Sequence, residues 1–258
     1  MPTPIPNPTP LSLPGDEAHL WIARPDALRD PDLLAAYTRL LSDDEARAGD
    51  QCRLPERRHE HLVTRALVRT VLSRYAGDVP PRAWRFTANP YGRPEIDAPA
   101  AATSLRFNLS NTHGLVVCLV ARDREVGVDV EAVDRPVRCL DVADHYFAPP
   151  EVAALRALPA AAQPERFLTY WTLKESYIKA RGMGLSLPLE QFAFVLDPAR
   201  PGAIAIEIDP ALGDRPERWQ FQTLRHRDTH AIATAVERRP GDLMPVRIVV
   251  RETVPLLD

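Results

Sequence analysis

Two kinds of hydrophobic periodicity alternate in blocks along this chain, and their order limits the folds that it can adopt. In the segment 57–77, apolar residues from Leu62 to Val71 recur at spacings of three and four, which predicts a helix with one buried stripe. Strand-like alternation follows, and a second helical block and a second strand block come after it. This order predicts an α+β protein with two similar lobes, each with helices packed on a small antiparallel sheet.

The same periods place the individual elements. Helices are expected at 31–49, 57–77, 140–158 and 164–182. Strands are expected at 19–25, 84–88, 105–110, 114–121, 125–133, 192–196, 203–208, 219–225, 230–237 and 246–250. The short polar link after residue 121 predicts that the strands on either side of it form a hairpin. Arg58, Arg65 and Arg69 are expected on the exposed face of their helix.

Composition bounds the class of protein. The 258 residues, 45% hydrophobic and 26% charged, are typical of a soluble globular chain, and no apolar run approaches the ~20 residues of a membrane span. A net charge of −3 provides no general basic field, so nucleic acid is not an expected partner. We expect a proline-rich flexible tail at 1–17, an N-terminal lobe at 18–122 and a C-terminal lobe at 123–258.

The cysteines indicate the compartment. Cys52, Cys118 and Cys139 are odd in number, widely spaced and in no CxxC arrangement. This pattern favours a reducing cytoplasm over a disulfide or zinc scaffold, and we expect the protein to be cytoplasmic.

Two carboxylates share one face of a predicted strand. In "VGVDVEAV", Asp129 and Glu131 alternate with Val128 and Val130, so the two carboxylates project together, ~7 Å apart along the strand. Like charges in this position repel unless a cation lies between them, and Mg²⁺ takes such oxygen ligands. The alternative is that both side chains face solvent.

A third carboxylate lies at the border of an apolar helical stripe. Trp171, Glu175 and Lys179 are one turn apart on one face of "YWTLKESYIKARG". Burying Glu175 is costly unless it is paired, hydrogen-bonded or bound to metal. The alternative is an exposed ion pair between Glu175 and Lys179, worth only ~0.3 to 0.5 kcal/mol.

The use of lysine is selective. Among 32 basic residues only Lys174 and Lys179 are lysines, and they lie five residues apart. An ammonium group is a compact point charge whose pKa can shift, whereas guanidinium is a fixed planar fork. A site that contacts one phosphate oxygen, or protonates a leaving phosphate, would require lysine.

Two further segments carry groups that can bind phosphate. "NPYGRP" presents Arg93 from a tight turn, and "FNLSNTHG" ends a strand with Ser110, Asn111 and Thr112. No P-loop, GxGxxG, GxSxG or HExxH pattern is present. Together with three carboxylates and two lysines, these segments favour a metal-assisted phosphoryl or pyrophosphate reaction.

These segments also resemble a known family. "VGVDVE", followed about forty residues later by "WTLKESYIKARGMGLSLPL", is similar to the signature pair of 4′-phosphopantetheinyl transferases of the surfactin-synthetase-activating type. "PYGRP" and "FNLSNT" resemble two further family blocks in the expected order, and the resemblance covers roughly residues 40–196. It implies a monomer of two pseudo-symmetric α+β lobes that binds coenzyme A.

The resemblance implies a reaction as well. The phosphopantetheine arm of coenzyme A would pass to a serine hydroxyl of an acyl or peptidyl carrier protein, with release of 3′,5′-ADP. Asp129, Glu131 and Glu175 would hold Mg²⁺, and Glu175 would also take the serine proton. Lys179 would contact the pyrophosphate and stabilise or protonate the departing ADP, with Lys174 as an auxiliary cofactor-binding residue.

The resemblance also implies further residues that bind coenzyme A, and at one of these positions the chain departs from the family pattern. Arg93 corresponds to a cation for the nucleotide end, and Ser110 corresponds to a phosphate-contacting serine. Many family members have a phosphate-binding histidine where this chain has Asn111, so His113 or a nearby arginine would have to compensate. Arg47 is a candidate for the family's early basic residue.

Two other functions use the same residues. A Mg²⁺-dependent nucleotide phosphodiesterase or pyrophosphatase would need the carboxylates and a positioned water, but no surface for a carrier protein. A carrier-binding module without catalysis would lack metal ligands, whereas Asp129, Glu131, Glu175 and Lys179 are all present.

Overall fold

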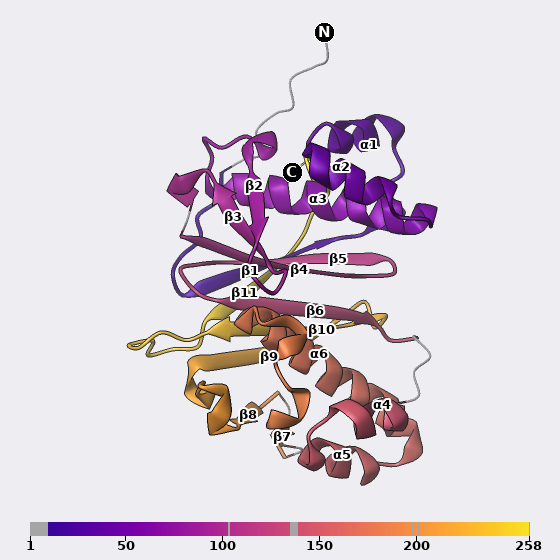
Figure 1. Ribbon diagram of the computed structural model, residues 1–258, viewed down its shortest axis with the longest axis vertical. Coiled ribbons are helices and arrows are strands. Elements are labelled where there is room, and N and C mark those ends of the chain that lie inside the picture. Colours follow the sequence, from indigo (N-terminus) through magenta and orange to yellow (C-terminus); the bar gives the residue numbers. More distant parts are fainter. Residues whose placement is uncertain (1–9, 103, 135–138, 198, 201, 258) are drawn as a thin grey trace. The chain divides into compact units, whose positions relative to one another are not determined.

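The computed structural model describes residues 10–102, 104–134, 139–197, 199–200 and 202–257. They form two units (Figure 1), which are described in turn. The first contains the described residues up to Asn89, together with 94–123 and 247–257. The second contains residues 90–93 and the described part of 124–246. The mixture of helices and small sheets confirms the predicted α+β class.

A four-stranded sheet forms the base of the first unit. Its strands, in spatial order, are β11 (Arg247–Glu252), β1 (Glu17–Ala23), β5 (Leu115–Arg122) and β4 (Leu105–Thr112). β1 pairs with β11 in parallel and with β5 antiparallel, and β4 pairs antiparallel with β5. A separate hairpin joins β2 (Arg85–Ala88) to β3 (Pro94–Ala98), a strand that the periodicity did not predict.

Three helices accompany this sheet: α1 (Pro31–Thr38), α2 (Asp43–Asp50) and α3 (Pro55–Tyr75). The predicted helix 31–49 is therefore two helices, because the Ser42 side chain caps α2 in a capping box with Glu45. α3 carries the predicted apolar stripe, and Val63, Leu67 and Val71 pack in one core cluster with Trp21 of β1. Burial of this stripe is the main source of stability for α3.

Arg69 departs from its predicted place on the exposed face of α3. Its side chain is buried and donates to Glu45 at 2.7 and 3.0 Å, and to the carbonyls of Pro81 and Trp84. Helical spacing places Arg69 off the apolar stripe, but α2 supplies a carboxylate to that position. Paired burial by a neighbouring helix is not visible in the period of α3 alone.

The second unit has a three-stranded antiparallel sheet and a hairpin. The sheet order is β6 (Val126–Ala132), β10 (His230–Glu237) and β9 (Trp219–His226), and the hairpin joins β7 (Phe192–Leu196) to β8 (Ile204–Ile208). Its helices are α4 (Cys139–Tyr146), α5 (Pro149–Arg156) and α6 (Gln163–Arg181). α6 packs against β6 and β10, so the longest helix of this unit covers the sheet that carries the predicted carboxylates.

The predicted hairpin of the strands 114–121 and 125–133 is wrong. β5 pairs with β1 and β4 in the first unit, whereas β6 pairs with β10 in the second. The turn at Asp123, whose φ is 52°, separates the two strands into different sheets. Alternation predicts each strand but not its partner.

The unit boundaries also differ from the predicted segments. Residues 247–257 lie with the first unit, because β11 pairs with β1. The expected tail 1–17 is packed where it is described: Leu13 is buried, and the Leu11 amide donates to the Arg74 carbonyl at 2.6 Å. Residues 1–9 of that tail lie outside the described residues.

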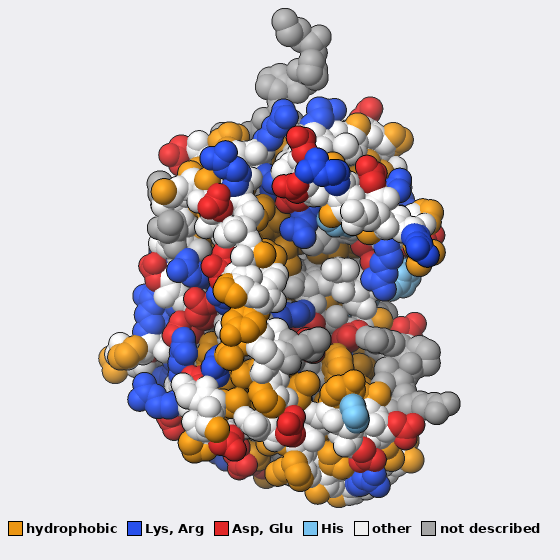
Figure 2. All heavy atoms as spheres, in the orientation of Figure 1, with side chains coloured by type: hydrophobic (Ala, Val, Ile, Leu, Met, Phe, Trp, Pro, Cys, Tyr) orange, Lys and Arg blue, Asp and Glu red, His pale blue; other side chains and the backbone are white. Residues whose placement is uncertain are grey.

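The surface and the helices agree with the composition. Figure 2 shows basic and acidic side chains interspersed over the face in view, as the small net charge predicts. No helix within the described ranges has the length and apolar character that a membrane crossing requires.

Candidate functional site

Strand β6 presents the two predicted carboxylates on one face. Val128 and Val130 are buried, and Asp129 and Glu131 alternate with them on the other side of the strand. Asp129 is buried and Glu131 is half-buried, so neither side chain is fully exposed to solvent. The alternative of two solvent-facing carboxylates does not describe Asp129.

Gly127 lets helix α6 lie directly on this strand. A Cβ atom at this position would fall 1.9 Å from the Ser176 carbonyl oxygen and 2.5 Å from the Ala180 amide nitrogen. Both are backbone atoms, which cannot rotate away as the end of a side chain can. The absence of a side chain at Gly127 therefore brings the backbones of β6 and α6 together.

The close approach brings Lys179 to Asp129. The Lys179 ammonium donates to Asp129 Oδ1 at 2.6 Å and to the Val128 carbonyl at 3.2 Å. The Asp129 side chain is 7% exposed and that of Lys179 is 27% exposed, so this charged hydrogen bond is only partly screened by water. The Lys179–Asp129 ion pair therefore joins helix α6 directly to strand β6.

Glu175 shares the electrostatic environment of the strand carboxylates. Burial raises the pKa of Glu175 above its ordinary value, and the negative charge of Asp129 raises it further. The Lys179 ammonium lowers this pKa, and the charge of Glu131 raises it. A half-buried carboxylate with a raised pKa can accept a proton from a substrate hydroxyl.

The arrangement as it stands is not a closed metal site. Within the described part of the chain, no three acidic, histidine or cysteine side chains are placed so that they could hold a metal ion together. The cation that contacts Asp129 is the Lys179 ammonium. The donors themselves, carboxylate oxygens on β6 and α6, are those that a hard divalent cation prefers.

Comparison with known proteins identifies the family. Residues 125–235, which include β6 and α6, match the family described as the 4′-phosphopantetheinyl transferase superfamily. The 4′-phosphopantetheinyl transferase HetI of Nostoc sp. (strain PCC 7120 / SAG 25.82 / UTEX 2576) is 35% identical over 205 residues, covering 78% of this chain and 83% of HetI. The chain belongs to this superfamily. The 4′-phosphopantetheinyl transferase Sfp of Bacillus subtilis (strain 168) is 34% identical over 155 residues, 58% of this chain and 63% of Sfp.

Family membership makes the chain a 4′-phosphopantetheinyl transferase. A further transferase of this name from Bacillus subtilis is 31% identical over 173 residues, 66% of this chain and 73% of that protein. The predicted resemblance is therefore confirmed. The alternatives, a nucleotide phosphodiesterase or a binding module without catalysis, gain no support from these relatives.

The contacts of Lys174 are not with the carboxylates of Asp129, Glu131 or Glu175, but with a different part of the second unit. Its side chain is fully buried, and its ammonium contacts Glu151 at 2.7 Å and donates to the carbonyls of Leu189 and Phe192. These three contacts use all three N–H bonds of the ammonium. The geometry gives no support to the predicted contact of Lys174 with the cofactor, and the role of Glu151 was not foreseen.

Arg93 lies in the same unit but is held at the end of α6. Its guanidinium donates to Glu125 at 2.6 Å and to the Ala180 carbonyl at 2.9 Å. Gly182, the residue that ends α6 at a φ of 64°, leaves room for it, because a Cβ there would fall 2.8 Å from Arg93 Cζ. The predicted contact of Arg93 with the nucleotide stays a prediction.

The other predicted cofactor residues belong to the first unit. Ser110 and Asn111 lie near the end of β4, where Ser110 is buried and Asn111 is exposed. His113 follows in the turn, with its Nδ1 3.9 Å from Glu60 Oε1. Arg47, on α2, is largely exposed and pairs with Asp44. Their roles toward coenzyme A stay predictions.

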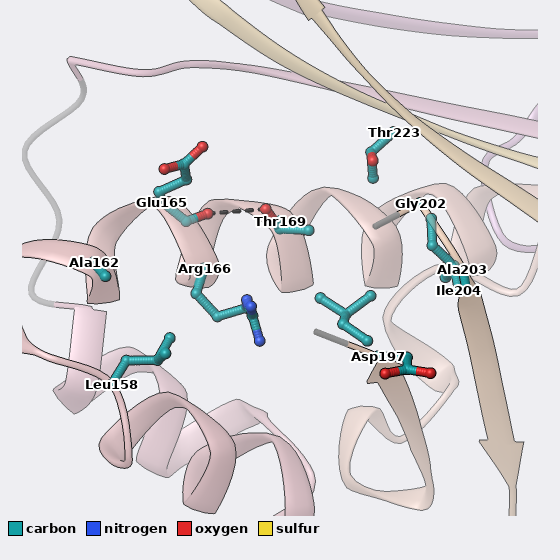
Figure 3. A pocket seen from close by; sticks show the side chains of 11 residues that line it. Leu158, Ala162, Glu165, Arg166, Thr169, Asp197, Gly202, Ala203, Ile204 and Thr223 are labelled. Carbon is teal, nitrogen blue, oxygen red and sulfur yellow. Dashed lines mark hydrogen bonds between the residues drawn. The ribbon is translucent and has the colours of Figure 1, made fainter. Parts of the chain in front are cut away.

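A surface pocket of about 430 Å³ lies elsewhere in the second unit, between α6 and the β7–β8 hairpin (Figure 3). Arg166 points into it, and Asp197 lies across from it. Thr169 donates to the Glu165 carbonyl at 2.9 Å along its wall. Neither Glu175 nor a β6 carboxylate lines this pocket, so we assign no chemistry to it.

Sequence reasoning missed Gly127 and Glu151. A glycine inside a strand pattern is a known sign of close backbone approach, so "VGVDVE" did contain a usable signal for Gly127. Glu151 had no comparable signal. It lies in the predicted helical segment 140–158, and its partner is on another helix.

Proposed function

We propose that this transferase moves the 4′-phosphopantetheine arm of coenzyme A to a serine hydroxyl of an apo acyl or peptidyl carrier protein, in a Mg²⁺-dependent reaction that releases 3′,5′-ADP. The observation that carries the proposal is the contact of Lys179 with Asp129 on the strand that faces the half-buried Glu175. Asp129, Glu175 and Lys179 all lie within residues 125–235, the segment that matches the family.

The reaction requires one bond to form and one to break at a single phosphorus. The serine oxygen attacks the phosphorus that carries pantetheine, and the bond from that phosphorus to the bridging oxygen of the nucleotide breaks. Glu175 accepts the serine proton, a role that its raised pKa supports. The Lys179 ammonium, already placed against β6, donates a hydrogen bond or a proton to the departing oxygen.

The donor set supports magnesium as the metal. Asp129, Glu131 and Glu175 would hold the ion, which, when bound, neutralises charge that develops on the pyrophosphate oxygens. Two observations support the fit: besides burial, the charges of Asp129 and Glu131 raise the pKa of Glu175, and the donor atoms of all three side chains are hard oxygens.

We extend the proposal to the partners and the setting of the enzyme. Carrier domains of polyketide, non-ribosomal peptide or fatty-acid synthases would supply the serine, in the cytoplasm, and the enzyme would act as a monomer. The two units would correspond to the two similar lobes that the sequence predicts. Secondary metabolite biosynthesis is the setting that such partners favour.

A mass measurement tests the proposed function. The protein is incubated with coenzyme A and Mg²⁺, with and without apo carrier proteins of each class. The expected result is a gain of one phosphopantetheine group on a carrier serine, with 3′,5′-ADP released in equal amount. Cleavage of coenzyme A at the same rate without any carrier would instead identify a hydrolase and overturn the proposal.

A further inference from the structure

The ammonium of Lys174 is bonded on all sides by groups of its own unit. Its side chain is 0% exposed, and Nζ lies 2.7 Å from Glu151 Oε2. Nζ also donates to the carbonyls of Leu189, at 2.8 Å, and Phe192, at 2.7 Å. Since an ammonium has three N–H bonds, this environment satisfies it fully.

Glu151 is equally satisfied. Its side chain is 0% exposed, Oε2 accepts from the Ala148 amide at 3.0 Å, and Oε1 accepts from the Phe194 amide at 2.9 Å. The Lys174–Glu151 pair therefore joins α6 to α5 and to the start of the β7 hairpin. Backbone carbonyls contact the ammonium of Lys174, and backbone amides contact the carboxylate of Glu151. The surroundings therefore suit a cation at position 174 and an anion at position 151, and not the reverse arrangement.

The space around Nζ explains why this residue is lysine. The ring centroid of Phe192 lies 4.2 Å from Nζ and that of Phe147 lies 5.6 Å away. A guanidinium would bring five N–H donors in a rigid plane to a position that offers three acceptors between aromatic rings. Two donors would then be buried without partners, at a substantial cost.

Burying this pair is expensive in itself. Burial lowers the pKa of Lys174 and raises that of Glu151, and their mutual attraction offsets these shifts. Pairs of this kind contribute little net stability compared with apolar residues of similar volume. A contribution to the orientation of α6 is therefore the role to test.

The pair lies on one side of α6, and the reactive groups lie on another. Lys174 directly precedes Glu175 and lies five residues before Lys179, on a helix that advances about 100° per residue. The contact at Gly127 holds the β6 side of α6, and the Lys174–Glu151 pair holds the side toward α5 and β7. The two contacts therefore hold α6 from two different sides.

We propose that Lys174 and Glu151 are positioning residues, which fix the rotation of α6 and thereby aim Glu175 and Lys179 at Asp129. The inference deepens the proposed function and rests on it for the roles of Glu175 and Lys179. It assigns Lys174 to the mechanism without any contact with the coenzyme.

The two lysines of the chain make a direct test possible. Labelling with ¹³C- and ¹⁵N-lysine gives side-chain signals from Lys174 and Lys179 alone. Lys179→Met assigns them, and Asp129→Asn marks the shift of Lys179 when its contact is lost. Glu151→Asp keeps the charge but shortens the side chain by one carbon, so it retracts the carboxylate from Lys174. Glu151→Gln removes the charge.

The proposal predicts that changing Glu151, which contacts Lys174, also moves the Lys179 signal toward its position in Asp129→Asn. Transfer should show a fall in kcat on the order of tenfold to a hundredfold, with the KM for the carrier protein within about twofold of the wild-type value. Leu155→Ala, a buried core change on α5, is the matched control. It should lower stability without moving the Lys179 signal or kcat.

The outcomes separate the two proposals. A Lys179 signal that stays at its wild-type position in both Glu151 variants overturns the positioning role, whatever the activity. A Lys179 signal that moves equally in Leu155→Ala overturns it too, because the effect would then be general loosening. The spectra need neither coenzyme A nor a carrier protein, so a wild-type enzyme that fails to transfer phosphopantetheine overturns the proposed function separately.

Discussion

At the scale of single residues, two charged side chains of helix α6, Glu175 and Lys179, are each partly shielded from water. Glu175 is only half-buried, yet its pKa is raised by burial and by its acidic neighbours. Lys179 holds its ammonium within 2.6 Å of Asp129 while remaining 27% exposed. Glu175 thus combines a raised pKa with partial access to solvent, while the fold orients the Lys179 ammonium against Asp129.

Glu175→Gln should lower kcat by roughly 10² to 10⁴-fold, because the amide cannot accept the serine proton. Its stability should equal or exceed that of the wild type, since the raised pKa means that the ionised carboxylate is disfavoured in the folded state. Single-turnover transfer and thermal unfolding measure the two effects. Glu165→Gln, an exposed change on the same helix, is the control and should leave both unchanged. Wild-type turnover by Glu175→Gln would remove this residue from the mechanism.

Lys179→Arg should lower kcat/KM on the order of tenfold, although it preserves the charge. The ammonium reaches Asp129 Oδ1 and the Val128 carbonyl as a point donor, and a planar guanidinium cannot occupy the same position. The reverse exchange at the exposed Arg200, Arg200→Lys, is the control and should have no effect. Equal activity of Lys179→Arg would show that only the charge matters.

The residues of the site were predictable in part. Strand alternation predicted that Asp129 and Glu131 share a face, and helical spacing placed Glu175 and Lys179 together, because both periods are local properties of the chain. Lys174 was assigned to the cofactor because its rarity drew attention to it. Its real partner, Glu151, lies 23 positions away on a separate helix, and spacing carries no information about such a contact.

At the scale of elements, the spacing between β6 and α6 is the feature on which the site depends. The glycine on β6 removes the side chain that would otherwise separate the two backbones. The loop after β10 is held to the start of β6 by a second device, in which buried Arg124 binds both carboxylate oxygens of Asp242. One contact fixes the strand against its helix, and the other fixes its end.

Gly127→Ala should destabilise the protein by about 3 kcal/mol or more, at the upper end of overpacking effects, because the new methyl group would meet backbone atoms of α6. Urea unfolding measures this loss. Gly15→Ala is the control, since a Cβ there meets nothing within 4 Å. Similar unfolding midpoints for the two variants would show that α6 can shift at little cost.

Asp242→Asn should lower stability in a pH-dependent manner. The hydrogen bond from Arg124 lowers the pKa of Asp242 to about 2, below its ordinary value of 3.8. A pKa lowered by folding means that the ionised carboxylate stabilises the folded state, fully above about pH 3.8, and that this contribution is lost as the pH falls toward 2. We expect a gap of about 1 kcal/mol at pH 6, allowing for screening by water.

Thermal unfolding of wild type and Asp242→Asn between pH 6 and pH 2 measures that gap. It should narrow across the acid range and close near pH 2. A gap that is constant with pH would show that the loop is held by contacts other than the ionised carboxylate.

Most elements could be predicted from the sequence, whereas their pairing could not. The stripes of α3 and α6 and the alternation of β4, β5, β6 and β10 are repeated within each segment, so a local pattern was sufficient. β3 was missed because its five residues, Pro94–Ala98, show no buried alternation and begin with proline. β5 and β6 were paired wrongly because proximity in sequence is a weak guide to partners in a sheet.

At the scale of the whole molecule, the chain leaves the first unit and later returns to it. Apart from residues 90–93, which also belong to the second unit, it leaves at Arg124, builds the rest of that unit, and comes back at Arg247 to pair β11 with β1. The Tyr37 hydroxyl then donates to the Pro255 carbonyl at 2.9 Å. The return depends on a pairing across more than 200 positions, which no local pattern in the sequence indicates.

Deletion of residues 247–258 should therefore destabilise the first unit selectively. β1 would become an edge strand on the side that β11 occupies, and the hydrogen bond from the Tyr37 hydroxyl to the Pro255 carbonyl would be lost. Hydrogen exchange should show loss of protection in β1, while amides of β10 in the second unit remain protected as an internal reference. Equal loss in both strands would show that the two units unfold together.

The return of the chain also has a consequence for synthesis on the ribosome. Among the strands that the structure describes, β1 is made first and β11 last, yet they are neighbours in one sheet. The second unit has all its residues by Val246, when the first still lacks its outer strand. During translation the unit that bears Glu175 and Lys179 can thus be complete first, although its residues are made later.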